Sequence, residues 1–352
     1  MENSTHRAEV VNVVLEKHKN ADLLSIARID NYQCVVKTED WAGKTKGIYV
    51  CPDTILPDKP EYAWLGGKLR IKARKFRNEW SEGLLLPAPE DAVVGTDMFE
   101  TLQLTHYEPG EPGRPGSKLG RAREYERHPN LSIPVYDLET AKKYAGCFEP
   151  GEPLFLTEKI HGCGSKYVYA RPRHKYRGLS LIERVKKFFS KQEYEFFIGS
   201  RKRWLRDGDN VWYKISKLYP QIERFCKDYP DHILYGEIFG SGIQSLQYGK
   251  NPGEIAFAAF DIRLPDGKYM DVLDAFNLAG EYTIPYVPVI DAAFKYDLEE
   301  LKKLADGSSL IPGAQHQIRE GLVASVLQER YSDRLRGRVK LKLVSNEYLQ
   351  KA

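Results

Sequence analysis

The chain has 352 residues, 29% of them charged and 42% hydrophobic, with a formal net charge of +4. This composition predicts a soluble protein with room for two domains, and the small net charge does not by itself indicate nucleic-acid binding. No apolar run approaches the roughly 20 residues of a membrane span, and the first residues lack the apolar core of a secretory signal, so no membrane association or secretion is expected.

The first hundred residues contain short apolar, β-branched runs separated by turn-forming clusters. Strands are predicted at 10–15, 34–37, 47–50 and 68–73. Regular short strands are typical of a small β-barrel. The stretch 14–30 is similar to the opening of OB-type barrels that bind tRNA or other nucleic acids; a generic small β-domain is the alternative.

A Pro/Gly-rich stretch at 109–116 predicts a linker. A basic run follows, consisting of Lys118, Arg121, Arg123 and Arg127. It is either a solvated linker or a strip that contacts phosphates between domains. The predicted organisation is an OB-type domain at 1–112, a basic linker at 113–128 and a second domain at 129–352.

The second domain mixes strands with helices, which predicts an α+β fold. Apolar residues recur at helical spacing between Val211 and Tyr229, and 297–304 is a short amphipathic helix. Strands are predicted at 233–239 and 255–262.

Five cysteines are scattered through the chain without a Cys-x-x-Cys pair: Cys34, Cys51, Cys147, Cys163 and Cys226. This argues against a disulfide scaffold or a zinc site. We therefore expect an intracellular, reducing compartment, either cytoplasm or nucleus.

The hexapeptide Glu158–Cys163 contains the first candidate for chemistry. In an extended segment, Lys159 and His161 point to one face and Ile160 points into the core. Gly162 then permits a tight turn or a close approach to a ligand. A lysine held in this way can act as a nucleophile, although the pattern alone is weak evidence.

Four further strand-like runs carry charged residues. Arg201 follows a Gly-Ser turn and could hold a ribose or a phosphate, or simply lie on the surface. Glu237 interrupts an apolar strand, where it could bind a metal or belong to a structural ion pair. Glu320 opens another apolar strand, as a second carboxylate of the same kind or simply as a polar strand end. Lys340 and Lys342 share one face of a strictly alternating strand, which could also be a solvated edge strand.

The order of these runs resembles the motif set of covalent nucleotidyltransferases, the superfamily of ATP-dependent DNA and RNA ligases and mRNA capping enzymes. The set comprises 159–162, 199–201, 235–237, 260–261, 320–323 and 340–342. Thr157-Glu158 before the lysine and His161 after it look most like the RNA ligase 2 branch. The layout with an OB barrel ahead of these motifs resembles RNA ligases that carry an N-terminal OB domain. The segments 82–87 and 104–109 also resemble that family.

This resemblance implies an α+β protein in which an OB-type β-barrel precedes an ATP-grasp-like adenylyltransferase domain with antiparallel sheets. It implies an ATP-dependent RNA ligase, active in RNA repair, that joins 3′-hydroxyl to 5′-phosphate ends. Lys159 would attack the α-phosphate of ATP, AMP would pass to the RNA 5′-phosphate, and a 3′-hydroxyl would displace it. The expected partner is RNA, with a nicked duplex as one open substrate, and the expected state is a monomer.

The resemblance also implies site roles. Lys340 and Lys342 would hold the α-phosphate, and Glu237 and Glu320 would bind Mg²⁺ or Mn²⁺, with a ribose contact as the alternative for Glu237. Phe260 would stack on adenine, opposite Ile160 or Val323. The remaining nucleotide contacts would come from main chain near Glu158, from Gly162 and from Arg201.

Two departures from the pattern stand out. Gly164 replaces the asparagine that RNA ligase 2 proteins carry near the sugar, which could shift that contact to Arg201 or Ser165. His161 stands where DNA ligases and capping enzymes carry aspartate, and its role is left open. A DNA ligase or capping guanylyltransferase, and a non-catalytic RNA-binding protein of the same fold, are the alternatives.

Overall fold

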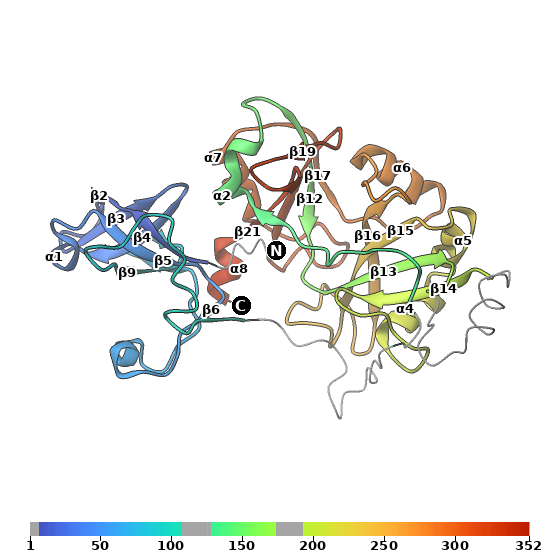
Figure 1. Ribbon diagram of the computed structural model, residues 1–352, viewed down its shortest axis with the longest axis horizontal. Coiled ribbons are helices and arrows are strands. Elements are labelled where there is room, and N and C mark those ends of the chain that lie inside the picture. The colour runs from blue at the N-terminus through green and yellow to red at the C-terminus, as the bar shows by residue number, and fades with distance from the viewer. Residues whose placement is uncertain (1–6, 108–124, 126–127, 174–192, 352) are drawn as a thin grey trace, which may run out of the picture.

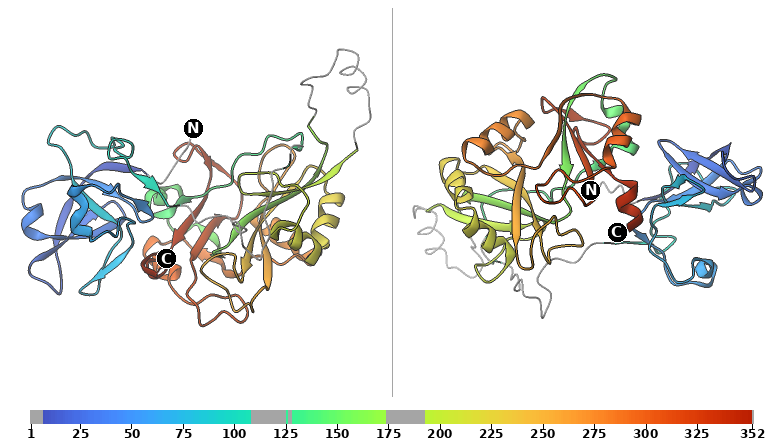
Figure 2. Two further views of the ribbon diagram at one scale, coloured as in Figure 1. Left: turned by 90° about the horizontal axis from the view of Figure 1, so that it is seen from below. Right: turned by 180° about the vertical axis from the view of Figure 1, so that it is seen from behind.

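The computed structural model describes residues 7–107, 125, 128–173 and 193–351 (Figure 1). The predicted basic run at Lys118, Arg121, Arg123 and Arg127 lies outside the described residues, as does most of the predicted linker. The N-terminal strands and the residues after 128 form two units that lie side by side, with helix α8 (Asn346–Lys351) at their junction (Figures 1 and 2).

The N-terminal unit is built from small antiparallel sheets around two apolar clusters. One sheet contains β1 (Ala8–Asn12), β5 (Lys46–Val50) and β9 (Leu84–Pro87), and another contains β2 (Val14–Lys17), β3 (Leu24–Ile29) and β4 (Tyr32–Lys37). Two strand pairs follow, β6 (Thr54–Ile55) with β10 (Thr105–His106) and β7 (Arg74–Phe76) with β8 (Glu79–Ser81). Helix α1 (Thr38–Trp41) and a 3-10 helix at Pro60–Leu65 complete it.

The predicted strands at 34–37 and 47–50 are confirmed, and two other predictions need correction. The predicted strand 10–15 is two strands, because Val13 leaves β1 to bond the Thr45 carbonyl. The predicted strand 68–73 is wrong: Leu69 and Ile71 bond the 53–56 segment irregularly, and only Arg70 forms a bridge. Among the described residues the pairings do not close into the predicted barrel.

Two sheets form the C-terminal unit, and all their pairings except β11–β21 are antiparallel. The first sheet has the order β11 (Glu139–Thr140), β21 (Lys340–Val344), β18 (Gly321–Val326), β12 (Pro153–Lys159) and β17 (Val289–Lys295). The second sheet has the order β14 (Glu195–Ser200), β13 (Cys163–Ala170), β15 (Ile233–Gly240) and β16 (Ile255–Arg263). A short pair, β19 (Tyr331–Ser332) and β20 (Gly337–Arg338), precedes β21.

Helices cover the outer faces of both sheets. The second sheet is covered by α4 (Val211–Leu218), α5 (Gln221–Asp228) and α6 (Val272–Glu281). The first sheet packs against α2 (Ala141–Tyr144), which leads into a 3-10 turn at Ala145–Cys147, and against α7 (Leu298–Ala305). The functional residues are left between the sheets and at the junction with the N-terminal unit.

The predicted strands at 233–239 and 255–262 and the helix at 297–304 are confirmed. The helical pattern from 211 to 229 is two helices, since Pro220 has no N–H to continue the first, and Leu218 is 60% exposed. The solvated-edge alternative for 338–344 is wrong, because β21 pairs with β11 on one side and β18 on the other.

None of the five cysteines, all of which are described, forms a disulfide. Within the described part of the chain, no helix is long and apolar enough to cross a membrane.

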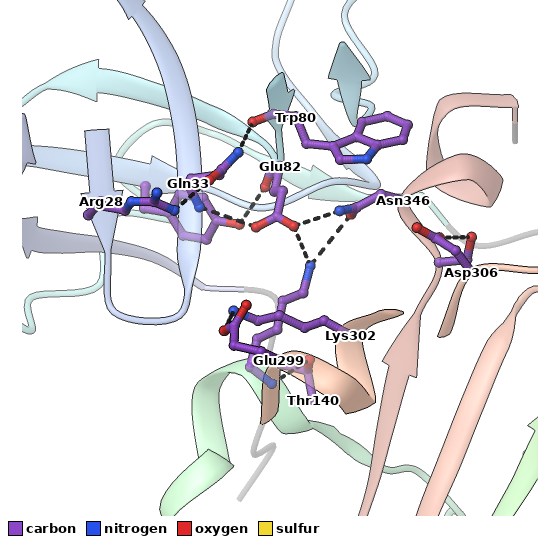
Figure 3. A network of polar contacts seen from close by, with 12 residues as sticks. Arg28, Gln33, Trp80, Glu82, Thr140, Glu299, Lys302, Asp306 and Asn346 are labelled. Atoms are coloured by element: carbon purple, nitrogen blue, oxygen red, sulfur yellow. Dashed lines mark hydrogen bonds and ion pairs between the residues drawn. The ribbon is translucent and has the colours of Figure 1, made fainter. Parts of the chain in front are cut away.

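A buried ion pair joins the two units. Glu82 of the N-terminal unit accepts hydrogen bonds from Lys142 Nζ at 2.7 Å and from Asn346 Nδ2 at 2.6 Å (Figure 3). Burial opposes the charge of Glu82, but Lys142 and Asn346 outweigh burial and hold the pKa of this carboxyl below its usual value. The carboxylate is therefore charged and tied to α2 and α8 at once.

We expect Glu82→Ala to destabilise the protein by about 3–5 kcal/mol, because Lys142 would be left as a buried, unpaired charge. Urea unfolding followed by tryptophan fluorescence measures the loss. Glu16→Ala is the matched control, since Glu16 pairs with Arg28 on the surface and its loss should cost at most about 1 kcal/mol. Equal losses in the two variants would contradict the importance of the buried pair.

Candidate active site

Lys159 lies in a cavity of about 1790 Å³ that both units line. The C-terminal unit contributes Lys159, His161 and Glu320, and the N-terminal unit contributes Asp53 and Arg70. The cavity therefore brings together residues as distant in the sequence as Asp53 and Glu320, because the two units are joined.

The register of the first sheet places Glu320 beside Lys159. Strand β12 pairs antiparallel with β18, and Lys159 lies opposite Gly321. Glu320, the residue before that glycine, accepts a hydrogen bond from Lys159 Nζ at 2.5 Å. A Cβ at residue 321 would lie 2.1 Å from the Leu343 carbonyl oxygen, so this close strand packing requires glycine.

His161 is held from three directions. Its backbone N–H donates to the Tyr248 hydroxyl at 2.6 Å, and its ring nitrogen Nδ1 lies 3.1 Å from the Tyr348 hydroxyl and 3.8 Å from Glu320 Oε2. Burial lowers the pKa of His161 below its ordinary value, although Glu320 opposes this effect. The ring is thus mainly neutral at neutral pH.

Glu237 faces the same region from the second sheet. Burial raises the pKa of Glu237 to about 8, while Lys159 lowers it and Glu320 raises it further. Gly162 makes this approach possible, because a Cβ there would lie 2.2 Å from the Ile238 carbonyl oxygen. A carboxyl that resists ionisation next to a second carboxylate is well suited to a cation, whose charge would stabilise both.

A second observation fits a cation at this place. Glu320 Oε2 is buried and has no hydrogen-bond partner. Magnesium and manganese prefer such carboxylate oxygens. Among the described residues, no group of three or more histidine, cysteine or acidic side chains gathers into a metal cage, so water and substrate oxygens would have to complete the coordination.

Two cations in the cavity converge on one carboxylate. Arg201 Nη2 lies 2.8 Å from Asp137 Oδ2, and Lys342 Nζ lies 3.4 Å from Asp137 Oδ1. Burial opposes the charge of Asp137, but Lys342 and Arg201 outweigh it and hold the pKa of this carboxyl below its usual value. Asp137 thus occupies a position that would suit a phosphate oxygen.

Lys340 lies elsewhere, although it shares a strand face with Lys342. Its amine is buried and bonds Asp261 Oδ2 at 2.9 Å and the Phe260 carbonyl at 3.1 Å. Arg338 binds the same Asp261 oxygen at 2.6 Å. Lys342 lines the cavity and Lys340 does not.

The residues expected at the base of a nucleotide lie deeper between the sheets. The Phe260 ring packs against Tyr136 with centroids 5.0 Å apart, Ile160 is buried, and Val323 is half-buried on β18. The Glu158 side chain is fully used, since it accepts from Ser309 Oγ at 2.7 Å and from the Leu310 N–H at 2.6 Å. Its carboxylate holds a loop, which leaves only its main chain for a ligand.

The structure therefore brings Lys159, His161, Glu320, Arg201 and Lys342 into one cavity lining. Glu237 lies outside that lining, although it is close enough to Lys159 and Glu320 for their charges to shift its pKa. The other expected residues that lie outside the lining are Lys340, Phe260, Ile160, Val323, Glu158 and Gly162. Sequence reasoning missed Asp137 and Tyr348. Its only available signal for Asp137 was a carboxylate in the Val-Tyr-Asp run near the start of the second domain. Tyr348 had none, because it follows the last charged strand on a short polar helix.

Comparison with known proteins gives two family matches. The RNA ligase family matches residues 152–343, and an OB-fold domain family matches residues 8–88. No curated protein matches the chain.

Solved structures match over nearly the whole chain. A mutant of Naegleria gruberi RNA ligase with AMP and manganese is 23% identical, with a TM-score of 0.76 and 99% of each chain covered. Another mutant of that ligase, with ATP and manganese, is 23% identical with a TM-score of 0.75 and 98% coverage of each chain. The same ligase with pyrophosphate is 24% identical, with a TM-score of 0.75 and 99% coverage of each. At this identity, the likeness establishes the fold.

We expect Asp137→Asn to bind inorganic pyrophosphate about two- to fivefold more tightly, because Arg201 and Lys342 lose a competing negative charge. The gain is modest because the Asp137 side chain is 53% exposed and solvent screens the pair. Isothermal titration calorimetry measures the affinity. Asp209→Asn, which removes an exposed carboxylate paired with Lys214 outside the cavity, should change nothing. Unchanged or weaker binding by the Asp137 variant would contradict the competition.

Proposed function

Because this chain belongs to the RNA ligase family, we propose that it is an ATP-dependent ligase that joins RNA 3′-hydroxyl and 5′-phosphate ends through a lysyl-AMP intermediate. The observation that carries the proposal is the Lys159–Glu320 pair on the wall of a cavity that also holds Arg201 and Lys342. A nucleophile, an acceptor for its proton and two phosphate-binding cations are thereby within one space.

In the first step, Lys159 Nζ attacks the α-phosphorus of ATP. An N–P bond forms and the bond to pyrophosphate breaks, while Glu320 is placed to accept the hydrogen that the amine gives up. Lys342 and Arg201 would stabilise the phosphate charge once Asp137 releases them. Lys340 could contact the α-phosphate only by leaving Asp261, so we propose that it positions β21 instead.

The cofactors follow from the relatives and the carboxylates. Two of the Naegleria structures contain ATP or AMP with manganese, and we propose ATP with Mg²⁺ or Mn²⁺ for this chain. Glu237 and Glu320 would hold the divalent cation, which supplies positive charge against the phosphate when bound. The adenine base would be lined by Phe260, Val323 and Ile160. Gly162 would let the sugar and phosphate approach closely, and the main chain at Glu158 would recognise the edge of the base.

In the later steps, AMP passes from Lys159 to the RNA 5′-phosphate, and the 3′-hydroxyl displaces AMP. We propose that the OB-fold domain, bounded at about residue 112, holds the RNA, with a linker at 113–128 leading into the catalytic domain at 129–352. The proposed setting is RNA repair by a monomer in an intracellular, reducing compartment.

The chain should become labelled by α-³²P-ATP and Mg²⁺ on a denaturing gel, and Lys159→Ala should abolish the label. Chelation of the metal before addition of ATP should also prevent labelling. Lys268→Ala is the matched control, because the Lys268 side chain is 82% exposed and lies outside the cavity. Absence of label with every divalent metal would favour a non-catalytic RNA-binding protein.

Ligation should require RNA on the 3′-hydroxyl side of the junction. Matched nicked duplexes that differ only in having RNA or DNA at the 3′-hydroxyl strand compare the two directly, with product measured on a sequencing gel. Equal sealing of both would contradict the RNA-ligase assignment of the substrate and favour a DNA ligase.

A further inference from the structure

Helix α8 lies at the junction of the two units and faces both (Figure 1). Asn346, in its first turn, donates to Glu82 of the N-terminal unit at 2.6 Å. Tyr348, two residues later, faces His161 across the cavity lining. The helix is therefore part of the site although it follows the last strand of the catalytic domain.

The position of α8 is set by the residue that precedes it. The Ser345 N–H donates to the Glu320 carbonyl at 2.9 Å, and Ser345 Oγ donates to Asp306 Oδ1 at 2.6 Å and accepts from the Tyr348 N–H at 3.1 Å. The start of α8 is thus bonded to the main chain of the same residue whose carboxylate binds Lys159.

Tyr348 is placed to fix the orientation of the His161 ring. Tyr348 is only 7% exposed. Its ring meets the His161 ring edge-on, with the two ring centroids 5.3 Å apart. The hydroxyl lies 3.1 Å from His161 Nδ1 and 3.4 Å from Nε2. Tyr248 already holds the His161 main chain, so Tyr348 is the contact that controls the ring itself.

We propose that Tyr348 is a positioning residue for lysine adenylylation, acting through His161. The order of contacts is Tyr348 hydroxyl, His161 ring, Glu320 carboxylate and Lys159 amine. With the hydroxyl in place, the ring stays against the otherwise unpartnered Glu320 Oε2, and Glu320 Oε1 keeps its direction toward Lys159. Without it, the ring can rotate and the carboxylate loses a defined neighbour. This inference rests on the proposed function, because its main readout is the labelling of Lys159.

The test compares the full-length chain with Tyr348→Phe, which removes only the hydroxyl. We expect the maximal rate of lysine adenylylation to fall about tenfold, the effect of one lost hydrogen bond, while the KM for ATP stays within about twofold. A general loss of folding would instead lower the thermal midpoint and the active fraction. Tyr331→Phe is the matched control, since Tyr331 is 66% exposed on β19 and lies outside the cavity.

A double-mutant cycle with His161→Ala decides whether Tyr348 acts through the histidine. We expect Tyr348→Phe to have little further effect on labelling when His161 is already alanine. If His161→Ala labels too slowly to measure, the same cycle is read in thermal midpoints, where the two losses should be less than additive.

Additive losses, or normal labelling by Tyr348→Phe, would overturn the inference while leaving the proposed function intact. A wild-type chain that takes up no label would overturn the proposed function instead, and the thermal cycle would then still test the contact between the two rings.

Discussion

The arrangement of the site depends on the pairing of β12 with β18. This register places Lys159 opposite Gly321, and so brings the Glu320 carboxylate to the lysine amine. A shift of one strand by one residue would turn its side chains to the opposite face of the sheet and so separate Lys159 from Glu320. The glycine allows the third strand, β21, to approach closely enough to bring Lys342 into the same cavity.

Charge in this region is balanced before any ligand arrives. Glu320 is matched by Lys159, Asp137 by Arg201 and Lys342, and Asp261 by Lys340 and Arg338. Buried charges need such partners because removal from water is costly. A phosphate that binds Arg201 and Lys342 must therefore exchange with Asp137, and its binding depends on the difference between two charge pairings rather than on attraction alone.

The local features of the site could be predicted from the sequence, and the long-range partners could not. Alternation along a strand predicted that Lys159 and His161 share a face, and both lie in the cavity lining. Glu237, which interrupts an apolar run, is half-buried on β15, and burial raises its pKa. The same alternation could not distinguish Lys340 from Lys342, because the difference depends on Asp261, which lies 79 residues from Lys340 and binds only that lysine. Tyr348 and Glu82 were missed for a similar reason: each acts across an interface that no periodicity describes.

In the fold, helical spacing overlooked the break at Pro220, and β-branched composition mistook the irregular 68–73 segment for a strand.

The two lysines of β21 would be retained in a family for different reasons. Lys340 is enclosed with Asp261, Arg338 and Glu329 in a buried group of alternating charges, so its replacement acts first on folding. Lys342 faces the cavity with 18% of its side chain exposed, so its replacement acts first on ligand binding. Two positions that look equivalent in a sequence motif are thus constrained by separate selective pressures, one on the stability of the catalytic domain and the other on its chemistry.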